Sequence, residues 1–381
     1  MRNMMSSNLS LIIATFFAIQ LGISCHTTKD DKVNAITDFS ALIQLVPKGS
    51  IFAEDGYYVW GASVIKGDDE LYHMFYSRWK EEYGFNAWVT HSEIAHATSE
   101  KPGGPFKFVN VALSPRGSEF WDGLTTHNPT VHKFDGKYYL YYMGTTGDGL
   151  VMQDLNFTHR NNQRIGVAWA EDPNGTWQRL NKPLVDVSQD EYADDALMAS
   201  NPSVTKMRDG NFLIVYKAVA KHEKLPFGGP VTHQAAIAET PLGPITKHNK
   251  RIFYKEGEHF PAEDPFVWYQ ESDDIYYGIV KDMHGAFTEC GVSLAFFKSK
   301  DGLNWEPSNN PLASKLEIKW EDGTVEKVAN LERAQILFEE GNPIMLYCAS
   351  TKDDPFTSET FNIHIPLKVN KLRTKVGLNS D

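Results

Sequence analysis

The 381-residue chain has few cysteines and no excess of positive charge. Its three cysteines are too few for a disulfide framework, and one of them, Cys25, belongs to an N-terminal processing pattern. Lysine and arginine number 37 against 49 aspartates and glutamates, a formal net charge of −12. This acidic balance argues against nucleic acid or an anionic membrane as a partner of the whole surface. A composition that is 41% hydrophobic and 23% charged excludes a disordered chain.

Long hydrophobic runs are also absent after the N-terminus. Residues 9–21 are mostly apolar, which is too short to span a bilayer comfortably and is typical of a signal-peptide core. The segment ends in Leu21-Gly22-Ile23-Ser24-Cys25, which resembles a bacterial lipobox. We therefore expect a lipoprotein-type signal peptide over 1–24, lipid attachment at Cys25 and a tether over 25–50. The protein is then exported to the periplasm or outer membrane, with an ordinary secretory signal as the alternative.

The chain shows almost no helical periodicity and instead repeats one pattern about every 63 to 73 residues. Each copy has an alternating run, a turn and a second alternating run. The five copies begin at Trp60-Gly61-Ala62-Ser63-Val64, His127-Asn128-Pro129-Thr130-Val131, Ser200-Asn201-Pro202-Ser203-Val204, Glu263-Asp264-Pro265-Phe266-Val267 and Glu332-Arg333-Ala334-Gln335-Ile336. This pattern predicts a β-hairpin at the start of each copy.

Each hairpin is followed by a third apolar run, a turn and a short fourth run, as in Ile165–Ala168 before Asn174-Gly175. Five such units predict an all-β fold, a single five-bladed β-propeller over 51–375. A β-sandwich would not need so long a repeat. Because propellers usually close with a strand from a terminus, we expect residues 36–46 or 361–369 to supply it.

In a propeller, the first strand of every blade lines the central channel, so the first two aligned positions of the five copies meet at one mouth. They are Trp60 and Gly61, His127 and Asn128, Ser200 and Asn201, Glu263 and Asp264, and Glu332 and Arg333. The second strands return to this mouth with Arg78, Lys217, Lys281, Asp282 and His284, and the third strands start there with His91, Arg160, Asn162, Gln163 and His233. The sequence therefore predicts a mouth that gathers carboxylates on blades four and five among several cations.

The segments Asn128-Pro129-Thr130-Val131, Glu263-Asp264-Pro265-Phe266-Val267-Trp268 and Leu331-Glu332-Arg333-Ala334-Gln335 resemble five-bladed propeller glycoside hydrolases of families 43, 32 and 117. The resemblance is greatest to family-43-like proteins of Bacteroidetes that use polysaccharides. It implies that an Asp before Pro acts as nucleophile or base, and that a Glu on another blade acts as general acid. Gly61, Asn128 and Asn201 stand where those families carry other acidic residues.

Glycoside hydrolysis needs one protonated and one ionised carboxyl group across the glycosidic bond. On the resemblance we expect Glu332 as general acid and Asp264 as base, with Asp122 or Asp55 as a third carboxylate that tunes the pKa. Glu263 is the first substitute, and the second is His284, since some family 117 enzymes are thought to use a histidine acid. The choice between inversion and retention stays open.

The cations at the mouth favour an anionic substrate, because arginine forks match carboxylate and sulfate oxygens. We expect an exo-acting hydrolase of uronate-bearing or sulfated oligosaccharides, with Trp60, Trp79, Trp88 and Trp121 available for stacking on sugars. The expected substrate-binding residues are Trp60, Arg78, His127, Asn128, Asn201, Lys217, Glu263, Lys281, His284 and Arg333. A surface glycan-binding propeller without catalysis and a polysaccharide lyase are the alternatives.

No local metal-binding spacing is visible among the histidines and cysteines. We expect no cofactor, with a structural Ca²⁺ or Na⁺ in the channel left open. The expected partner is an oligosaccharide, and contact with the membrane is expected only through the lipid at Cys25. The oligomeric state is not indicated by the sequence.

Overall fold

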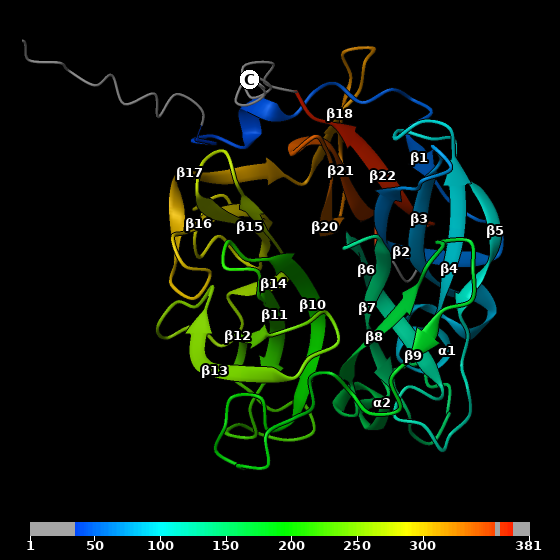
Figure 1. The fold of residues 1–381 in the computed structure, drawn as a ribbon, viewed down its shortest axis with the longest axis vertical. Coiled ribbons are helices and arrows are strands. Elements are labelled where there is room, and N and C mark those ends of the chain that lie inside the picture. The colour runs from blue at the N-terminus through cyan, green and yellow to red at the C-terminus, as the bar shows by residue number, and fades with distance from the viewer. Residues whose placement is uncertain (1–34, 355–358, 369–381) are drawn as a thin grey trace, which may run out of the picture. The chain divides into compact units, whose positions relative to one another are not determined.

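Five four-stranded antiparallel sheets follow one another along the chain and form the blades of a β-propeller in the computed structural model (Figure 1). The structure describes residues 35–354 and 359–368. The predicted signal peptide and Cys25 lie outside the described residues. The predicted all-β five-bladed propeller is confirmed.

In blades 1 to 4 the strands run outward from the channel in chain order. Blade 1 has β2 (Tyr57–Lys66), β3 (Tyr72–Lys80), β4 (Glu93–Ser99) and β5 (Lys107–Leu113); blade 2 has β6 (Thr125–Phe134), β7 (Lys137–Thr145), β8 (Arg164–Ala170) and β9 (Gln178–Arg179). Blade 3 has β10 (Met198–Lys206), β11 (Phe212–Val219), β12 (Val231–Ala238) and β13 (Ile245–Ile252); blade 4 has β14 (Ala262–Gln270), β15 (Ile275–Asp282), β16 (Ser293–Ser299) and β17 (Trp305–Lys315). Figure 1 shows β2, β6, β10, β14 and β20 (Asn330–Glu339) arranged around the centre.

The fifth blade closes the ring with a strand from the N-terminal side. It contains β20, β21 (Asn342–Thr351) and β22 (Thr360–Pro366), and its outer strand is β1 (Ile51–Phe52). Ile51 pairs with Ile363 and Phe52 with Asn362. A strand from the N-terminal side closes the ring, as expected, but the predicted positions 36–46 and 361–369 are wrong, because the closing strand is at residues 51–52 and residues 361–366 belong to the third strand. Pairing β1 with β22 joins the two ends of the propeller.

Residues 35–50, which fall in the expected tether, pack against blades 4 and 5. The side chain of Phe39 is fully buried, with its ring 5.5 Å from Phe296 and 6.3 Å from Trp268. Ile36 and Val46 are buried in the same apolar cluster. Burying a large apolar side chain stabilises a fold by about 1.5–3 kcal/mol. The packing of the propeller therefore begins before residue 51.

Short elements connect the blades. A hairpin of β18 (Glu317–Lys319) and β19 (Val325–Lys327) joins blades 4 and 5, and the loops of blades 1 and 2 carry α1 (Trp88–His91) and α2 (Phe157–Asn161). Three 3₁₀ turns lie at Ser40–Leu42, Glu81–Tyr83 and Phe85–Ala87. Within the described ranges, none of the helices has the length and apolar character needed to cross a membrane.

The five inner strands share one backbone irregularity. Each is bulged at the aligned position, where its register with the second strand shifts. The second aligned residues all have a left-handed φ: Gly61 (61°), Asn128 (52°), Asn201 (51°), Asp264 (51°) and Arg333 (52°). Gly adopts this conformation freely and Asn and Asp tolerate it, whereas it is uncommon for other residues. The shared conformation supports the alignment of the five sequence copies.

Candidate active site

The bulges lie at the end of the channel where the inner strands begin. There the second strands end, since Met198 pairs with Val219, Ala262 with Asp282 and Asn330 with Thr351. Loops carrying α1 and α2 leave the second strands at the same end. We call this end the mouth. The residues of the bulges and of the ends of the second strands therefore meet there, as the repeat predicts.

The second aligned residues form a hydrogen-bonded ring across the channel. Nδ2 of Asn128 donates to Oδ1 of Asn201 (2.9 Å), and Nδ2 of Asn201 donates to Oδ1 of Asp264 (2.6 Å). Nη1 of Arg333 lies 3.5 Å from the same Asp264 oxygen, and its Nη2 donates to the backbone oxygen of Asn128 (3.4 Å). A Cβ at Gly61 would lie 3.4 Å from Cγ of Arg333, so this glycine packs directly against the arginine.

Asp264 is 5% exposed within this ring. Burial raises its pKa, and the nearby charge of Glu263 adds to the rise, while Arg333 opposes it. One of its oxygens is already engaged by Asn201 and Arg333. Asp264 therefore lies beneath the outermost carboxyl groups of the mouth.

Two glutamate–lysine pairs lie one residue nearer the mouth and join neighbouring blades. Nζ of Lys217, on β11, donates to Oε1 of Glu263, on β14, at 2.6 Å. Nζ of Lys281, on β15, donates to Oε1 of Glu332, on β20. The side chains of Glu263 and Glu332 keep 19% and 14% of their surface exposed. Both carboxyl groups are thus mostly buried and still reachable from solvent.

The pKa values of the two glutamates move in opposite directions. Burial would raise the pKa of Glu263, but Lys217 and Lys281 outweigh it and lower the pKa to about 2. Burial raises the pKa of Glu332, and the charges of Asp264 and Glu263 add to the rise against the pull of Lys281. A pair of carboxyl groups with separated pKa values is the pattern of an acid and an ionised partner.

Two buried histidines border the charged groups. Nδ1 of His127 lies 2.8 Å from Oγ of Ser92, and burial, with Arg333 and Lys217, lowers its pKa well below the usual value. His233 pairs with Lys217 across β11 and β12; burial, with Lys217, lowers its pKa to about 3. Neither ring nitrogen of His233 has a hydrogen-bond partner among the described residues. Both imidazoles are therefore neutral at physiological pH.

The structure places other predicted residues elsewhere. Asp122 is buried against Arg116 (2.7 Å) and Arg179 (3.3 Å) and accepts a hydrogen bond from Tyr142 (2.6 Å). Asp55 is exposed in the turn before β2. Neither is brought to the two glutamate–lysine pairs by any contact in the described part of the chain. The position expected for a third carboxylate is taken instead by Asp264.

Two further predicted binding residues lie at the edge of the site or beyond it. Arg78 pairs with Glu54 (2.9 Å) and Glu93 (3.0 Å) in blade 1. Nε2 of His284 lies 2.9 Å from Oε2 of Glu258, and both side chains are partly exposed. Arg78 is therefore already neutralised within its own blade, and His284 stands outside the buried cluster.

The tryptophans expected to stack on sugars are mostly enclosed. Trp60 and Trp79 are buried in an aromatic cluster with Phe85, while Trp121 stacks on Tyr142 in blade 2. Trp88 is half-buried and lies 5.1 Å from His127, measured between ring centroids. Trp88 is thus the one of these four that borders the mouth residues with part of its surface free.

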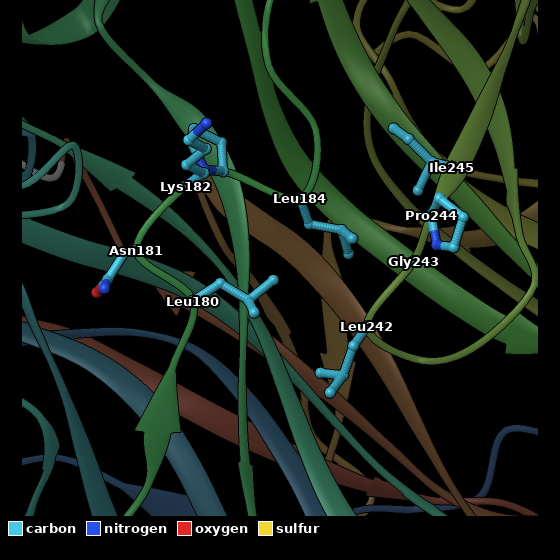
Figure 2. Close-up of a pocket in the computed structure, with 9 residues that line it drawn as sticks. Leu180, Asn181, Lys182, Leu184, Leu242, Gly243, Pro244 and Ile245 are labelled. Atoms are coloured by element: carbon cyan, nitrogen blue, oxygen red, sulfur yellow. The ribbon is translucent and has the colours of Figure 1, made fainter.

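Two cavities in the described structure lie away from the charged cluster. One of about 400 Å³ lies between blades 2 and 3 and is lined by residues 180–184 and 242–245 (Figure 2). Another, of about 300 Å³, is lined by residues of blade 4 and its loops, including Phe253, Phe287 and Trp305. Among the described residues, no three His, Cys, Asp or Glu side chains are grouped to hold a metal ion. We therefore define the candidate site by its charged residues at the mouth.

Sequence reasoning missed two residues that support the mouth. Ser92 contacts His127, and the backbone oxygen of Phe227 accepts a hydrogen bond from Arg160. Both lie outside the aligned strand starts. A long loop between the second and third strands was the only sequence signal for them.

Solved structures similar to this chain include glycoside hydrolases. Zg3597, a family 117 glycoside hydrolase of the marine bacterium Zobellia galactanivorans, is 16% identical over 85% of this chain and 89% of its own, with a TM-score of 0.58. A thermostable family-43 glycoside hydrolase is 15% identical over 89% and 97%, with a TM-score of 0.56. The Bacillus subtilis arabinanase Arb43A is 15% identical over 82% and 96%, with a TM-score of 0.54.

No protein-family model and no curated protein matches the chain. At these identities the similarity concerns the fold. The predicted resemblance is confirmed at that level, since the similar structures are propellers of families 117 and 43. The chain therefore shares the five-bladed propeller fold of these glycoside hydrolases.

Proposed function

We propose that this protein is a glycoside hydrolase that uses Glu332 and Glu263 as its acid and its ionised carboxylate. The observation that carries the proposal is a pair of mostly buried carboxyl groups at the mouth, each held by a lysine of the preceding blade, whose pKa values shift in opposite directions. The fold shared with glycoside hydrolases supports it.

In this mechanism the protonated carboxyl of Glu332 gives its proton to the leaving glycosidic oxygen. The ionised carboxylate of Glu263 acts on the anomeric carbon, either directly or through a water molecule. Asp264, beneath them, helps to keep Glu332 protonated through its charge. This arrangement gives Asp264 the tuning role and Glu263 the role first expected of Asp264, because one oxygen of Asp264 is held by Asn201 and Arg333.

The proposed substrates are oligosaccharides from a complex polysaccharide that bear uronate or sulfate groups. Lysines and arginines around the carboxyl groups favour an anionic sugar. Because Glu263 and Glu332 are mostly buried at the channel mouth, a chain end would reach them more readily than a chain interior, which supports exo action. We further propose that the protein acts outside the cytoplasm, anchored by lipid at Cys25.

The test is incubation with a panel of neutral, uronate-bearing and sulfated oligosaccharides, with products identified by mass. We expect single sugars, each heavier by one water than the residue it came from. Glu332→Gln and Glu263→Gln should each lower the rate by about 100-fold or more. Glu306→Gln is the matched control, because Glu306 pairs with Lys298 on the exposed outer part of blade 4. Wild-type rates in both site variants would overturn the assignment.

A glycan-binding propeller without catalysis is the second candidate. Asn128 and Asn201 favour it, because they occupy ring positions equivalent to the acidic Asp264. It predicts that a labelled oligosaccharide binds and is recovered intact. A lyase would instead give products absorbing in the ultraviolet through a new double bond.

A further inference from the structure

Arg160 is a buried cation in the loop between β7 and β8. It lies in α2, and this loop leaves blade 2 at the mouth, since Thr145 at the end of β7 pairs with Thr125 at the start of β6. Arg160 is 6% exposed. A buried charge is costly unless an opposite charge accompanies it. The groups around this guanidinium therefore decide whether its buried charge is compensated.

The partners of Arg160 in the structure are neutral. Its Nη1 donates to Oδ1 of Asn161 (2.9 Å) and to the backbone oxygen of Phe227 (2.5 Å). The guanidinium carbon lies 4.7 Å from the ring centroid of Phe227 and 6.0 Å from that of Phe157. Its Nε and Nη2 donate to no residue in the described ranges, and neither atom is fully enclosed.

The other cations that the repeat pattern predicts at the mouth each have a carboxylate. Lys217 pairs with Glu263, Lys281 with Glu332, Arg333 with Asp264 and Arg78 with Glu54 and Glu93. No described carboxylate lies within 4.0 Å of Arg160. Among these predicted mouth cations, Arg160 is therefore the one without a counter-ion in the described part of the chain.

The charge of Arg160 interacts with the proposed catalytic pair. Burial lowers its pKa to about 10, and the charge that opposes this fall is that of Glu263. The side chain stays protonated at neutral pH. Phe227, whose backbone oxygen accepts a hydrogen bond from Arg160, lies in the loop between β11 and β12, which leaves the strand of Lys217 at the same mouth.

We propose that Arg160 is the binding site for the acidic group of the substrate, a carboxylate or a sulfate on a sugar next to the scissile bond. This inference rests on the proposed function and identifies the residue that would give the protein its preference for anionic sugars. Nε and Nη2 form a fork that can donate hydrogen bonds to two oxygens of one oxyanion. The ring of Phe227, which is 39% exposed, lies against the guanidinium and offers an apolar face to the sugar.

The experiment is calorimetric titration of the full chain with glucuronate, galactose 6-sulfate and neutral galactose at one ionic strength. We expect at least one acidic sugar to bind and galactose to bind at least ten-fold more weakly. The relative affinities of the two acidic sugars show whether a carboxylate or a sulfate is preferred. Arg160→Gln should weaken the acidic sugar at least ten-fold, and Arg160→Lys should weaken it less. Arg164→Gln is the control, because Arg164 already pairs with Asp186 (2.7 Å) and should leave binding unchanged.

Equal affinity of wild type and Arg160→Gln, or equal affinity for acidic and neutral sugars, would overturn the proposal. If Arg160→Gln does not fold, a crystal of the wild-type protein soaked with the acidic sugar decides. An oxyanion on Arg160 supports the site, and an oxyanion found only elsewhere overturns it. Binding is measured without turnover, so an acidic sugar that binds at Arg160 in a protein that hydrolyses nothing would retain this inference and reject the hydrolase.

Discussion

Nζ of Lys217 lies 2.6 Å from Oε1 of Glu263, and this contact joins blade 3 to blade 4 at the mouth of the channel. Residues 217 and 263 belong to different sequence copies, so the fold is what brings them together. Together with Lys281, Lys217 outweighs the effect of burial and keeps Glu263 ionised. The proposed division of roles depends on this contact.

Replacing Lys217 with Met should raise the pKa of Glu263. In the proposed mechanism the ionised form of Glu263 is the active one, so activity should be lost as pH falls through this pKa, which is lowered to about 2 in the folded protein. Removal of a nearby opposite charge moves such a pKa by about one to three units. The acidic limb of kcat/KM against pH should therefore move upward by about that amount. An unchanged acidic limb would show that Lys217 does not set this pKa.

Glu332→Gln should remove the proton donor. Activity should fall by about 100-fold or more on natural glycosides and much less on aryl glycosides with acidic leaving groups, which need little protonation. In the proposed mechanism the protonated form of Glu332 is the active one, and burial raises its pKa. Native activity should thus decline as pH rises through that pKa, and the variant should lack this limb. A variant that loses both substrate classes equally would contradict the assignment.

Low pH should weaken the fold through Glu263. Its pKa is lower in the folded chain than the usual value of 4.5, so its ion pairs stabilise the protein fully above about pH 4.5. This contribution is lost as pH falls from there toward 2. Thermal unfolding measured between pH 6 and 3 should show a smaller loss of Tm for Glu263→Gln than for the wild type. Equal losses of Tm in the variant and the wild type would contradict a stabilising role for ionised Glu263.

Gly61→Ala should destabilise the propeller. Gly61 has φ of 61°, a conformation that costs other residues about 1–2 kcal/mol, while an added Cβ would make ordinary contacts, at 3.4 Å, with Arg333 and Asn128. A fall of a few degrees in Tm is expected. Gly49→Ala is the control, since it has ordinary φ and nothing within 4 Å of the added atom. Equal Tm values for the two variants would count against a strained ring position.

Phe39→Ala should show that residues 35–50 belong to the propeller. The side chain is fully buried against Phe296 and Trp268, and such truncations cost about 3–5 kcal/mol. Leu45→Ala, at a residue that is 54% exposed, should change the free energy of unfolding little. Chemical denaturation of both variants measures the difference. A stable Phe39→Ala protein would return this segment to the role of a tether.

Sequence repetition was sufficient to predict the propeller and its five equivalent mouth positions. Each copy marks its inner strand with the same pattern, and the five left-handed residues from Gly61 to Arg333 follow from that alignment. The pattern also brought Glu263, Asp264 and Glu332 to one place. Such local signals repeat, so one sequence is enough to detect them.

The pairing of side chains across blades could not be predicted from the sequence. Arg78 lies near the end of a second strand and Arg160 in a loop before a third strand, both at the mouth, yet Arg78 is neutralised by Glu54 and Glu93, while Arg160 has only neutral partners. Asp122 is enclosed by Arg116 and Arg179 for the same reason. Which side chains pair across blades depends on the conformations of the loops, and the loop sequences do not repeat from one copy to the next.

The most direct test of the account is a titration of the two glutamate carboxyl groups by ¹³C NMR on protein labelled at glutamate. Signals are assigned by their loss in Glu263→Gln and Glu332→Gln. The account predicts that Glu332 takes up its proton above the usual pH of 4.5, while Glu263 stays ionised down to about pH 2. Two carboxyl groups that titrate together near 4.5 would contradict it.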